Sequence, residues 1–137
     1  MSNRLRVVLG IVAGVILVGS SAAHSLLGWK RLGAALASAG APPDLITGLG
    51  IGWHFAGVAM LTFGVIVIRL FADLRRRPVS LWPALIIAVV YLAFGVGALA
   101  VSDMNPFFLV FIVPGLMLLL ASWGRPVPAP LADRNRR

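Results

Sequence analysis

The sequence predicts an all-α integral membrane protein, a bundle of four transmembrane helices with both termini in the cytoplasm. The first observation is four uncharged, apolar stretches, each with the ~20 residues that a helix needs to cross a hydrocarbon core about 30 Å thick. The second is composition: 60% of the 137 residues are hydrophobic and 12% are charged, about half the charged share of a soluble domain. The third is an uneven distribution of arginine, which orients membrane proteins.

The predicted spans cover residues 7–29, 45–68, 79–102 and 105–124 and form one transmembrane domain, residues 1–124. Lipid offers no partners for backbone N–H and C=O groups, so such stretches are expected to be helical. Residues 125–137 are rich in proline and arginine and are predicted to be a disordered basic cytoplasmic tail. No soluble catalytic module is expected within these 137 residues.

The first span also resembles a secretory signal peptide, with possible cleavage near Ala23. Cleavage would leave three spans, so we expect the segment to be retained. The link to the second span is the one long connection. Its residues 30–36 are expected to form a short helix lying in the outer interface, ended by Gly40, Pro42 and Pro43, with Asp44 as the N-cap of the second helix.

The third and fourth spans are predicted to form an antiparallel hairpin, because only Asp103, Met104 and Asn105 separate them. Pro106 then occupies a first-turn position, where a missing N–H costs nothing. Pro114 lies in the middle of the fourth span and is expected to kink it.

Charge predicts the orientation of these spans. On one side of the membrane the only basic residues are Lys30 and Arg31, accompanied by Asp44 and Asp103. The other side carries ten arginines: Arg4, Arg6, Arg69, Arg75, Arg76, Arg77, Arg125, Arg134, Arg136 and Arg137. The arginine-rich side is the cytoplasmic one, which fits a bacterial inner membrane. The net charge of +8 therefore indicates topology and attraction to anionic lipid, at about 1 kcal/mol per nearby basic residue, rather than nucleic-acid binding.

No Asp, Glu, Lys or Arg lies inside the spans, and His24 and His54 are the two histidines there. A carboxylate-driven exchanger would need an acidic group in the membrane, and the absence of cysteine excludes thiol chemistry and iron–sulfur clusters. Two imidazoles without a carboxylate or thiolate leave metal coordination incomplete. We therefore predict no catalytic residues, no metal site and no enzymatic activity.

Helical periodicity predicts which faces pack. His24 and His54 each belong to a small, polar stripe expected to face the bundle interior, so that the two imidazoles face each other. The stripes are Gly10, Gly14, Leu17, Ser21 and His24 on the first helix, and Thr47, Gly50, His54, Gly57 and Leu61 on the second. Two further packing seams are predicted: Gly48, Gly52 and Ala56 on the second helix, and Ala84, Ala88, Tyr91, Gly95, Ala98 and Ser102 on the third.

The histidines have two interpretations. In the first, each is a neutral imidazole that joins helices by a hydrogen bond to Ser21, Thr47, Tyr91 or a backbone carbonyl. In the second, His24 and His54 are the axial ligands of a haem b, for which an apolar slot, small residues and imidazoles at similar depth are needed. Two histidines do not make a motif, so the sequence leaves both open.

Two segments, Ser20 to His24 and Trp53 to Ala56, resemble the motifs of a family of small bacterial four-span membrane proteins of unknown function. That family has a Gly-Ala-His type motif at the end of helix one and a His-Ala motif in helix two. Here Ser21-Ala22-Ala23-His24 replaces the first motif, and Pro106-Phe107-Phe108 stands where the family has Pro and then Gly-Gly. The resemblance implies a location in the membrane and no particular activity.

The expected function is therefore that of a non-enzymatic subunit or accessory component of a membrane complex, packed against itself or against a larger membrane protein. A haem-binding electron-transfer or sensor protein that uses His24 and His54 is the first alternative. A small oligomeric transporter is the second, and the low charge of the spans disfavours it.

Overall fold

The structure is a computed structural model, and it describes residues 1–123. All elements in this part of the chain are helical: α1 (Asn3–Ala22), the π-helix η1 (Ala23–Gly28), α2 (Trp29–Ser38), α3 (Pro43–Leu74), α4 (Trp82–Val101), the 3₁₀-helix η2 (Pro106–Phe108) and α5 (Leu109–Ser122). The predicted all-α class is confirmed. The predicted tail, residues 125–137, lies outside the described residues.

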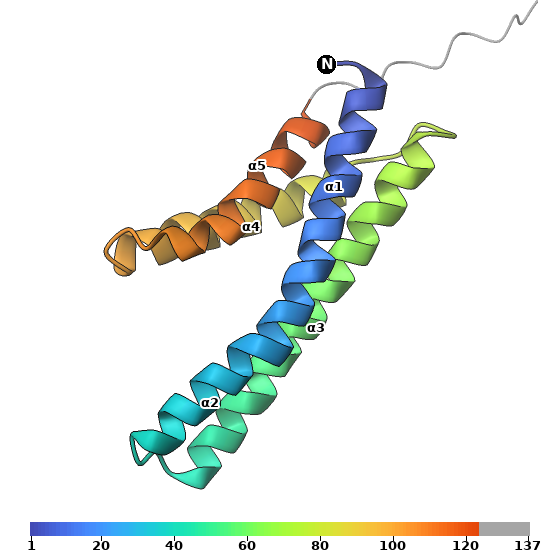
Figure 1. The fold of residues 1–137 in the computed structure, drawn as a ribbon. Helices are drawn as coiled ribbons and strands as arrows, with labels where there is room; N and C mark the ends of the chain where they lie inside the picture. Colours follow the sequence, from blue (N-terminus) through green and yellow to red (C-terminus); the bar gives the residue numbers. More distant parts are fainter. Residues whose placement is uncertain (124–137) are drawn as a thin grey trace, which may run out of the picture.

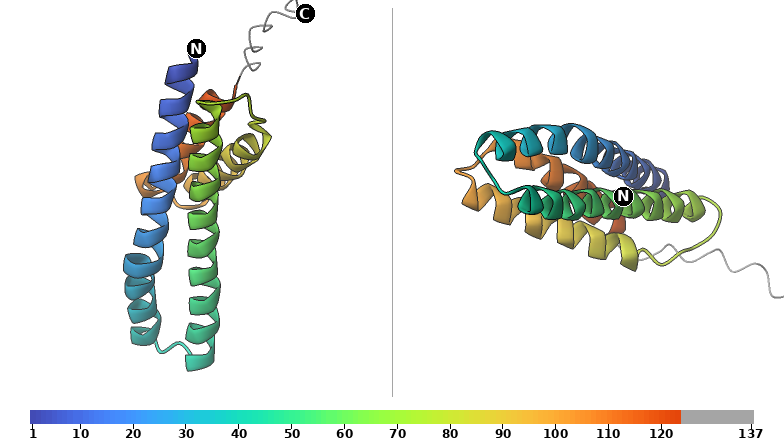
Figure 2. Two further views of the ribbon diagram at one scale, coloured as in Figure 1. Left: turned by 90° about the vertical axis from the view of Figure 1, so that its right-hand side faces the viewer. Right: turned by 90° about the horizontal axis from the view of Figure 1, so that it is seen from below.

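The helices form two hairpins of different length (Figure 1). The long hairpin consists of α3 and one continuous helix made of α1, η1 and α2, and the short hairpin consists of α4 and α5. The short hairpin crosses the long one obliquely and reaches it mainly through contacts of α5 with α1. Figure 2 shows that α2 and the beginning of α3 extend beyond it. One half of the long hairpin is thus left uncovered.

Three helices are long and apolar enough to cross a membrane, judged by length and composition. They cover Asn3–Ser38, Pro43–Leu74 and Trp82–Val101, with 36, 32 and 20 residues. The fourth apolar segment, Pro106–Ser122, is a shorter helix. The chain therefore has the helices of a membrane protein.

The expected interfacial helix at residues 30–36 is wrong as a separate element, because α2 continues the first helix through η1. No proline occurs before Pro42, and the helix ends at Ser38, two residues before Gly40 with its φ of +73°. At 1.5 Å per residue the continuous helix is about 54 Å long, so it exceeds a hydrocarbon core of about 30 Å. The predicted cap is also wrong: Pro42 is the N-cap of α3, and Asp44 lies in its first turn.

The contact between α1 and α3 follows a spacing of seven residues, which is typical of left-handed helix packing. Four residues of the stripe predicted on the first helix, Gly10, Gly14, Leu17 and Ser21, are buried, and the fifth, His24, is half-buried. The stripe predicted on α3 is partly wrong: Gly50 and Gly57 are buried, whereas Thr47, His54 and Leu61 are exposed. The buried line of α3 instead continues through Gly64 and Phe71.

Glycine at this contact brings the two backbones together. A methyl group added at Gly64 would lie 2.7 Å from Val18 Cγ2 and 3.0 Å from the carbonyl oxygen of Gly14. By contrast, nothing lies within 4 Å of such a methyl group at Gly48 or Gly52. The seam predicted at Gly48, Gly52 and Ala56 is therefore not a contact between helices within residues 1–123.

The short hairpin forms as predicted. Ala84, Ala88, Tyr91 and Gly95 of the predicted seam are buried, and Gly95 lies against Ile112 of α5. The tight link has positive φ at Asp103 and Met104, and the Asn105 side chain accepts a hydrogen bond of 3.0 Å from the N–H of Phe107 at the start of η2.

Candidate functional site

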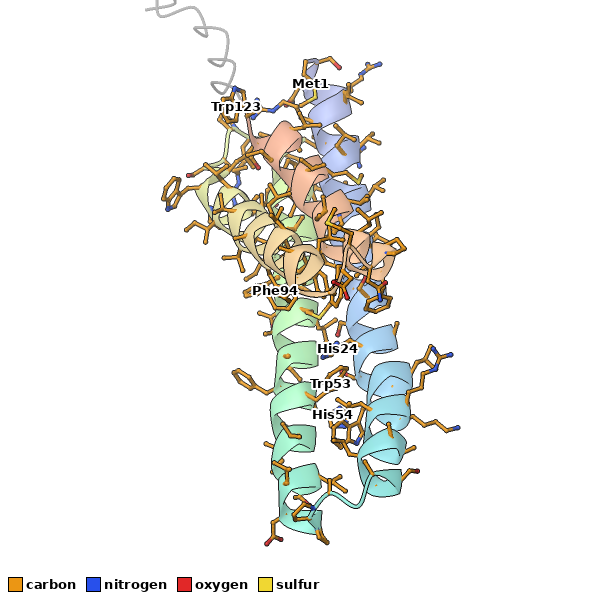
Figure 3. The ribbon with its side chains drawn as sticks, turned by 90° about the vertical axis from the view of Figure 1, so that its left-hand side faces the viewer. Met1, His24, Trp53, His54, Phe94 and Trp123 are labelled. Carbon is orange, nitrogen blue, oxygen red and sulfur yellow. The ribbon has the colours of Figure 1, made fainter. Side chains whose placement is uncertain are left out.

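The predicted site residues, His24 and His54, lie on the two helices of the long hairpin, His24 in η1 and His54 in α3 (Figure 3). Each imidazole is paired with a tryptophan of the other helix. The ring of His24 stacks on Trp53, with centroids 4.2 Å apart and planes within 3° of parallel. The ring of His54 meets Trp29 edge to face, with centroids 6.0 Å apart and an interplanar angle of 62°. We call these four residues the His–Trp cluster.

His24 and Trp53 also exchange polar contacts across the helix pair. The indole Nε1 of Trp53 donates a hydrogen bond of 2.8 Å to the carbonyl oxygen of His24. His24 Nε2 lies 3.2 Å from the carbonyl oxygen of Trp53 and donates to it when the ring is protonated on that nitrogen. This carbonyl contact is one of those proposed for a histidine that joins helices, and it connects η1 to α3 without any cofactor.

The π-helix positions these groups. The carbonyl of His24 accepts the backbone N–H of Trp29, five residues further on, instead of the residue four positions on that a regular α-helix would use. Directly after this wider turn, the ring of Trp29 lies against Gly50 of α3. π-Helical turns of this kind occur frequently at functional sites.

Both indoles pack against glycine of the opposite helix. A methyl group at Gly28 would lie 2.9 Å from Cζ2 of Trp53, and one at Gly50 would lie 2.7 Å from Cζ2 of Trp29. A side chain at either glycine would therefore push an indole out of the contact. One turn deeper, Ser21 Oγ donates a buried hydrogen bond of 2.7 Å to the carbonyl of Gly57 and extends the same seam.

The rings run in the order His24, Trp53, Trp29 and His54, and the two indole centroids are 6.3 Å apart. The imidazoles thus reach each other through two indoles and do not face across an open slot. Axial ligands of one haem must approach the iron from its two faces, so both indoles would have to move. Haem binding stays a prediction. Among residues 1–123, no three His, Cys, Asp or Glu side chains come together as a metal site.

The sequence did not predict the inward position of Trp29. A tryptophan at the end of a membrane span is typical of the headgroup level, and Trp82 and Trp123 are accordingly 64% and 72% exposed. Trp29 is half-buried against α3 instead. The feature of the sequence that could have indicated this inward position is the pair of glycines, Gly28 and Gly50, each of which lies opposite an indole.

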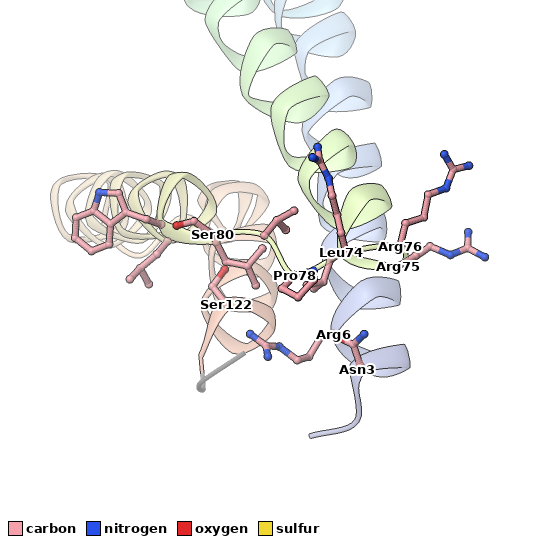
Figure 4. A pocket seen from close by; sticks show the side chains of 13 residues that line it. Asn3, Arg6, Leu74, Arg75, Arg76, Pro78, Ser80 and Ser122 are labelled. Carbon is pink, nitrogen blue, oxygen red and sulfur yellow. The ribbon is translucent and has the colours of Figure 1, made fainter. Parts of the chain in front are cut away.

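A second candidate site lies at the other end of the molecule (Figure 4). A pocket of about 540 Å³ opens where α1 and α4 begin and where α3 and α5 end. Arg6 lies in its wall, is only 6% exposed, and donates from Nε to the carbonyl oxygen of Ala121 over 2.9 Å. From the sequence, Arg6 was interpreted only as one of the arginines that mark the cytoplasmic side. Its spacing with Gly10, Ala13 and Leu17, all buried, was the signal that it faces inward.

Comparisons with models of known families, with curated proteins and with solved structures find no match to this chain. The resemblance based on His24 and on Trp53 to Ala56 therefore stays a prediction.

Proposed function

We propose that the protein is a non-enzymatic component of a membrane assembly, with four crossings of a bacterial inner membrane and both termini in the cytoplasm. The antiparallel pairing of α4 with α5 supports the fourth crossing. With four crossings, an even number, the chain returns to the side of the membrane on which it started. The 17 residues of Pro106–Ser122 reach the lower limit of about 17 residues for a crossing helix.

The distribution of charge along the long hairpin supports this orientation. Arg4 and Arg6 at the start of α1 and Arg69 near the end of α3 belong to one end, and Lys30 and Arg31 belong to α2. A helix that crosses in ~20 residues and leaves the cytoplasm near Arg6 reaches the outer boundary near residue 26. The His–Trp cluster then lies at this boundary, and α2 extends beyond it.

We expect cysteines placed at Ala34 and at Ser80 to give opposite results when intact cells are treated with an impermeant thiol reagent. Both residues are exposed, and they lie in α2 and in the link before α4. Ala34→Cys should be labelled in intact cells, whereas Ser80→Cys should be labelled only after the membrane is opened. The opposite pattern would reverse the proposed orientation.

The observation that carries the assembly role is the exposed imidazole of His54. It lies on α3 in the half of the long hairpin that α4 and α5 leave uncovered, on one helical line with the exposed Thr47. At the outer boundary of the membrane, an exposed imidazole is available for a hydrogen bond to a polar group of a neighbouring helix. We therefore infer that a helix from a second copy or from a larger membrane protein packs on this line.

A photo-crosslinking residue at Val58 tests this inference. Val58 lies one turn from His54 and is 59% exposed, and Val90 on α4 is 51% exposed and serves as the matched control. In cells, the Val58 position should give a crosslinked product and the Val90 position should not. The mass of the product then distinguishes a second copy from another protein.

His54→Leu should reduce the Val58 product several-fold, since it removes the group that a partner would meet, while Phe55→Leu should leave it unchanged. Crosslinking of equal yield at positions 58 and 90, or at neither, would contradict an assembly through this part of α3.

A further inference from the structure

We propose that the pocket around Arg6 binds the phosphate headgroup of an anionic phospholipid from the cytoplasmic leaflet. The pocket has a volume of about 540 Å³ and is formed by four chain segments that meet at one end of the bundle (Figure 4). Its lining residues are Asn3, Arg6, Leu74, Arg75, Arg76, Arg77, Pro78, Val79, Ser80, Leu81, Trp82, Leu85 and Ser122. It is distinct from the His–Trp cluster and from the uncovered half of α3.

Arg6 provides a buried positive charge in the pocket wall. Its guanidinium is oriented by the bond from Nε to Ala121, at the carboxyl end of α5, where the helix dipole favours a cation. Within residues 1–123 the structure gives Arg6 no carboxylate partner. A buried charge is costly unless it is paired, and the donors that remain on a guanidinium match the oxygens of a phosphate.

Ser122 supplies a second, independent sign of a missing acceptor. Its Oγ atom is buried and has no hydrogen-bond partner in the described part of the chain. The residue lines the same pocket as Arg6. A buried hydroxyl without a partner carries a free-energy penalty, which a phosphate oxygen within reach would remove.

The rim of the pocket is strongly basic. Arg75, Arg76 and Arg77 follow α3 and are all exposed. Only Arg77 is paired within residues 1–123, through a salt bridge of 3.0 Å to Asp73. The first turn of α4 has no side-chain cap, and its free N–H groups add to the positive potential that binds phosphate at helix starts.

The apolar part of the lining favours a lipid over a free phosphate. Leu74, Val79, Leu81 and Leu85 line the pocket together with the arginines. The exposed ring of Trp82 stands at the start of α4, a position typical of the membrane interface. A glycerol backbone and the first acyl carbons would contact these side chains, while basic pockets between transmembrane helices hold the headgroup.

Native mass spectrometry of the full-length protein tests this proposal with phosphatidylglycerol and phosphatidylcholine of identical acyl chains. The wild type should retain phosphatidylglycerol with about tenfold preference or more, as expected for a charge-assisted hydrogen-bonded site. Arg75→Gln with Arg76→Gln should abolish most of the preference. Lys30→Gln with Arg31→Gln removes the same charge from α2 and should leave it unchanged.

Ser122→Ala removes a hydroxyl that makes no bond among residues 1–123, so this variant should fold and bind the anionic lipid several-fold more weakly. Equal losses in the two double variants would show attraction by net charge alone and would overturn the proposal. So would equal retention of the two lipids. Displacement of phosphatidylglycerol by millimolar glycerol phosphate or inorganic phosphate would show that a soluble phosphate, and not a lipid, is the ligand.

Discussion

Gly64→Leu is expected to lower the free energy of unfolding by about 3 kcal/mol or more, at the upper end of the cost of overpacking. At this position a side chain meets Val18 and the backbone carbonyl of Gly14. A backbone atom cannot rotate away as a side chain can, so α1 and α3 would have to separate. Unfolding of the purified protein by a denaturing detergent, followed by circular dichroism, measures the change.

Gly19→Leu is the matched control for this substitution. Gly19 lies on α1, in the same helix pair, and no atom lies within 4 Å of a methyl group placed there. Its change should stay within about 0.5 kcal/mol of the wild type, as for other surface substitutions. Similar losses in both variants would show that α1 and α3 do not pack through Gly14 and Gly64.

Trp53→Ala should be the second most damaging substitution, with a loss of about 2 to 3 kcal/mol. The estimate combines an aromatic stacking term of about 0.5 to 1.5 kcal/mol with His24, an interhelical hydrogen bond of about 0.6 to 1.7 kcal/mol and the packing against Gly28. Phe55→Ala, two residues further on, removes a side chain that is 74% exposed. It should change stability by less than about 0.5 kcal/mol in the same unfolding measurement.

The absorption spectrum of the same preparations decides between the two interpretations of the histidines. If His24 and His54 join helices, the wild type is colourless, and His24→Gln costs at most about 1 to 2 kcal/mol. A stoichiometric Soret band that is lost in His54→Ala would instead make the histidines haem ligands. In that case Trp53→Ala should widen access to the site and should not abolish the band.

The periodicity of the first helix was sufficient to predict its buried face. Gly10, Gly14, Leu17 and Ser21 follow a regular spacing, and all four are buried against neighbours. The seam of α4 was predictable for the same reason, from Ala84 to Gly95. Small residues let helices approach closely, and each of these two lines lies against a partner helix in the structure.

The face of α3 was harder to predict, because this helix carries two interleaved sets of small residues. Gly48 and Gly52 are spaced by four, whereas Gly50, Gly57 and Gly64 are spaced by seven. Only the second set matches the contacts that α1 offers. Choosing between the two sets requires the partner helix, which a sequence pattern on α3 alone does not contain.

The geometry of the His–Trp cluster also could not be predicted from the sequence, for a physical reason. The sequence predicted that His24 and His54 face each other, whereas in the structure Trp53 and Trp29 lie between the two imidazoles. It could not foresee the π-helical turn at Ala23–Gly28, because no residue type requires one. This turn and the length of the continuous helix determine that Trp29 faces α3.

The bond between Arg6 and Ala121 has a consequence for the order in which the protein is made. These residues are 115 positions apart, so the amino end of α1 stays without this neighbour until α5 has been synthesised. The contacts of α1 with α3 become available much earlier, and those of α4 with α5 depend on a short link. The contact between α1 and α5 therefore joins the two hairpins only after the residues of both hairpins are available.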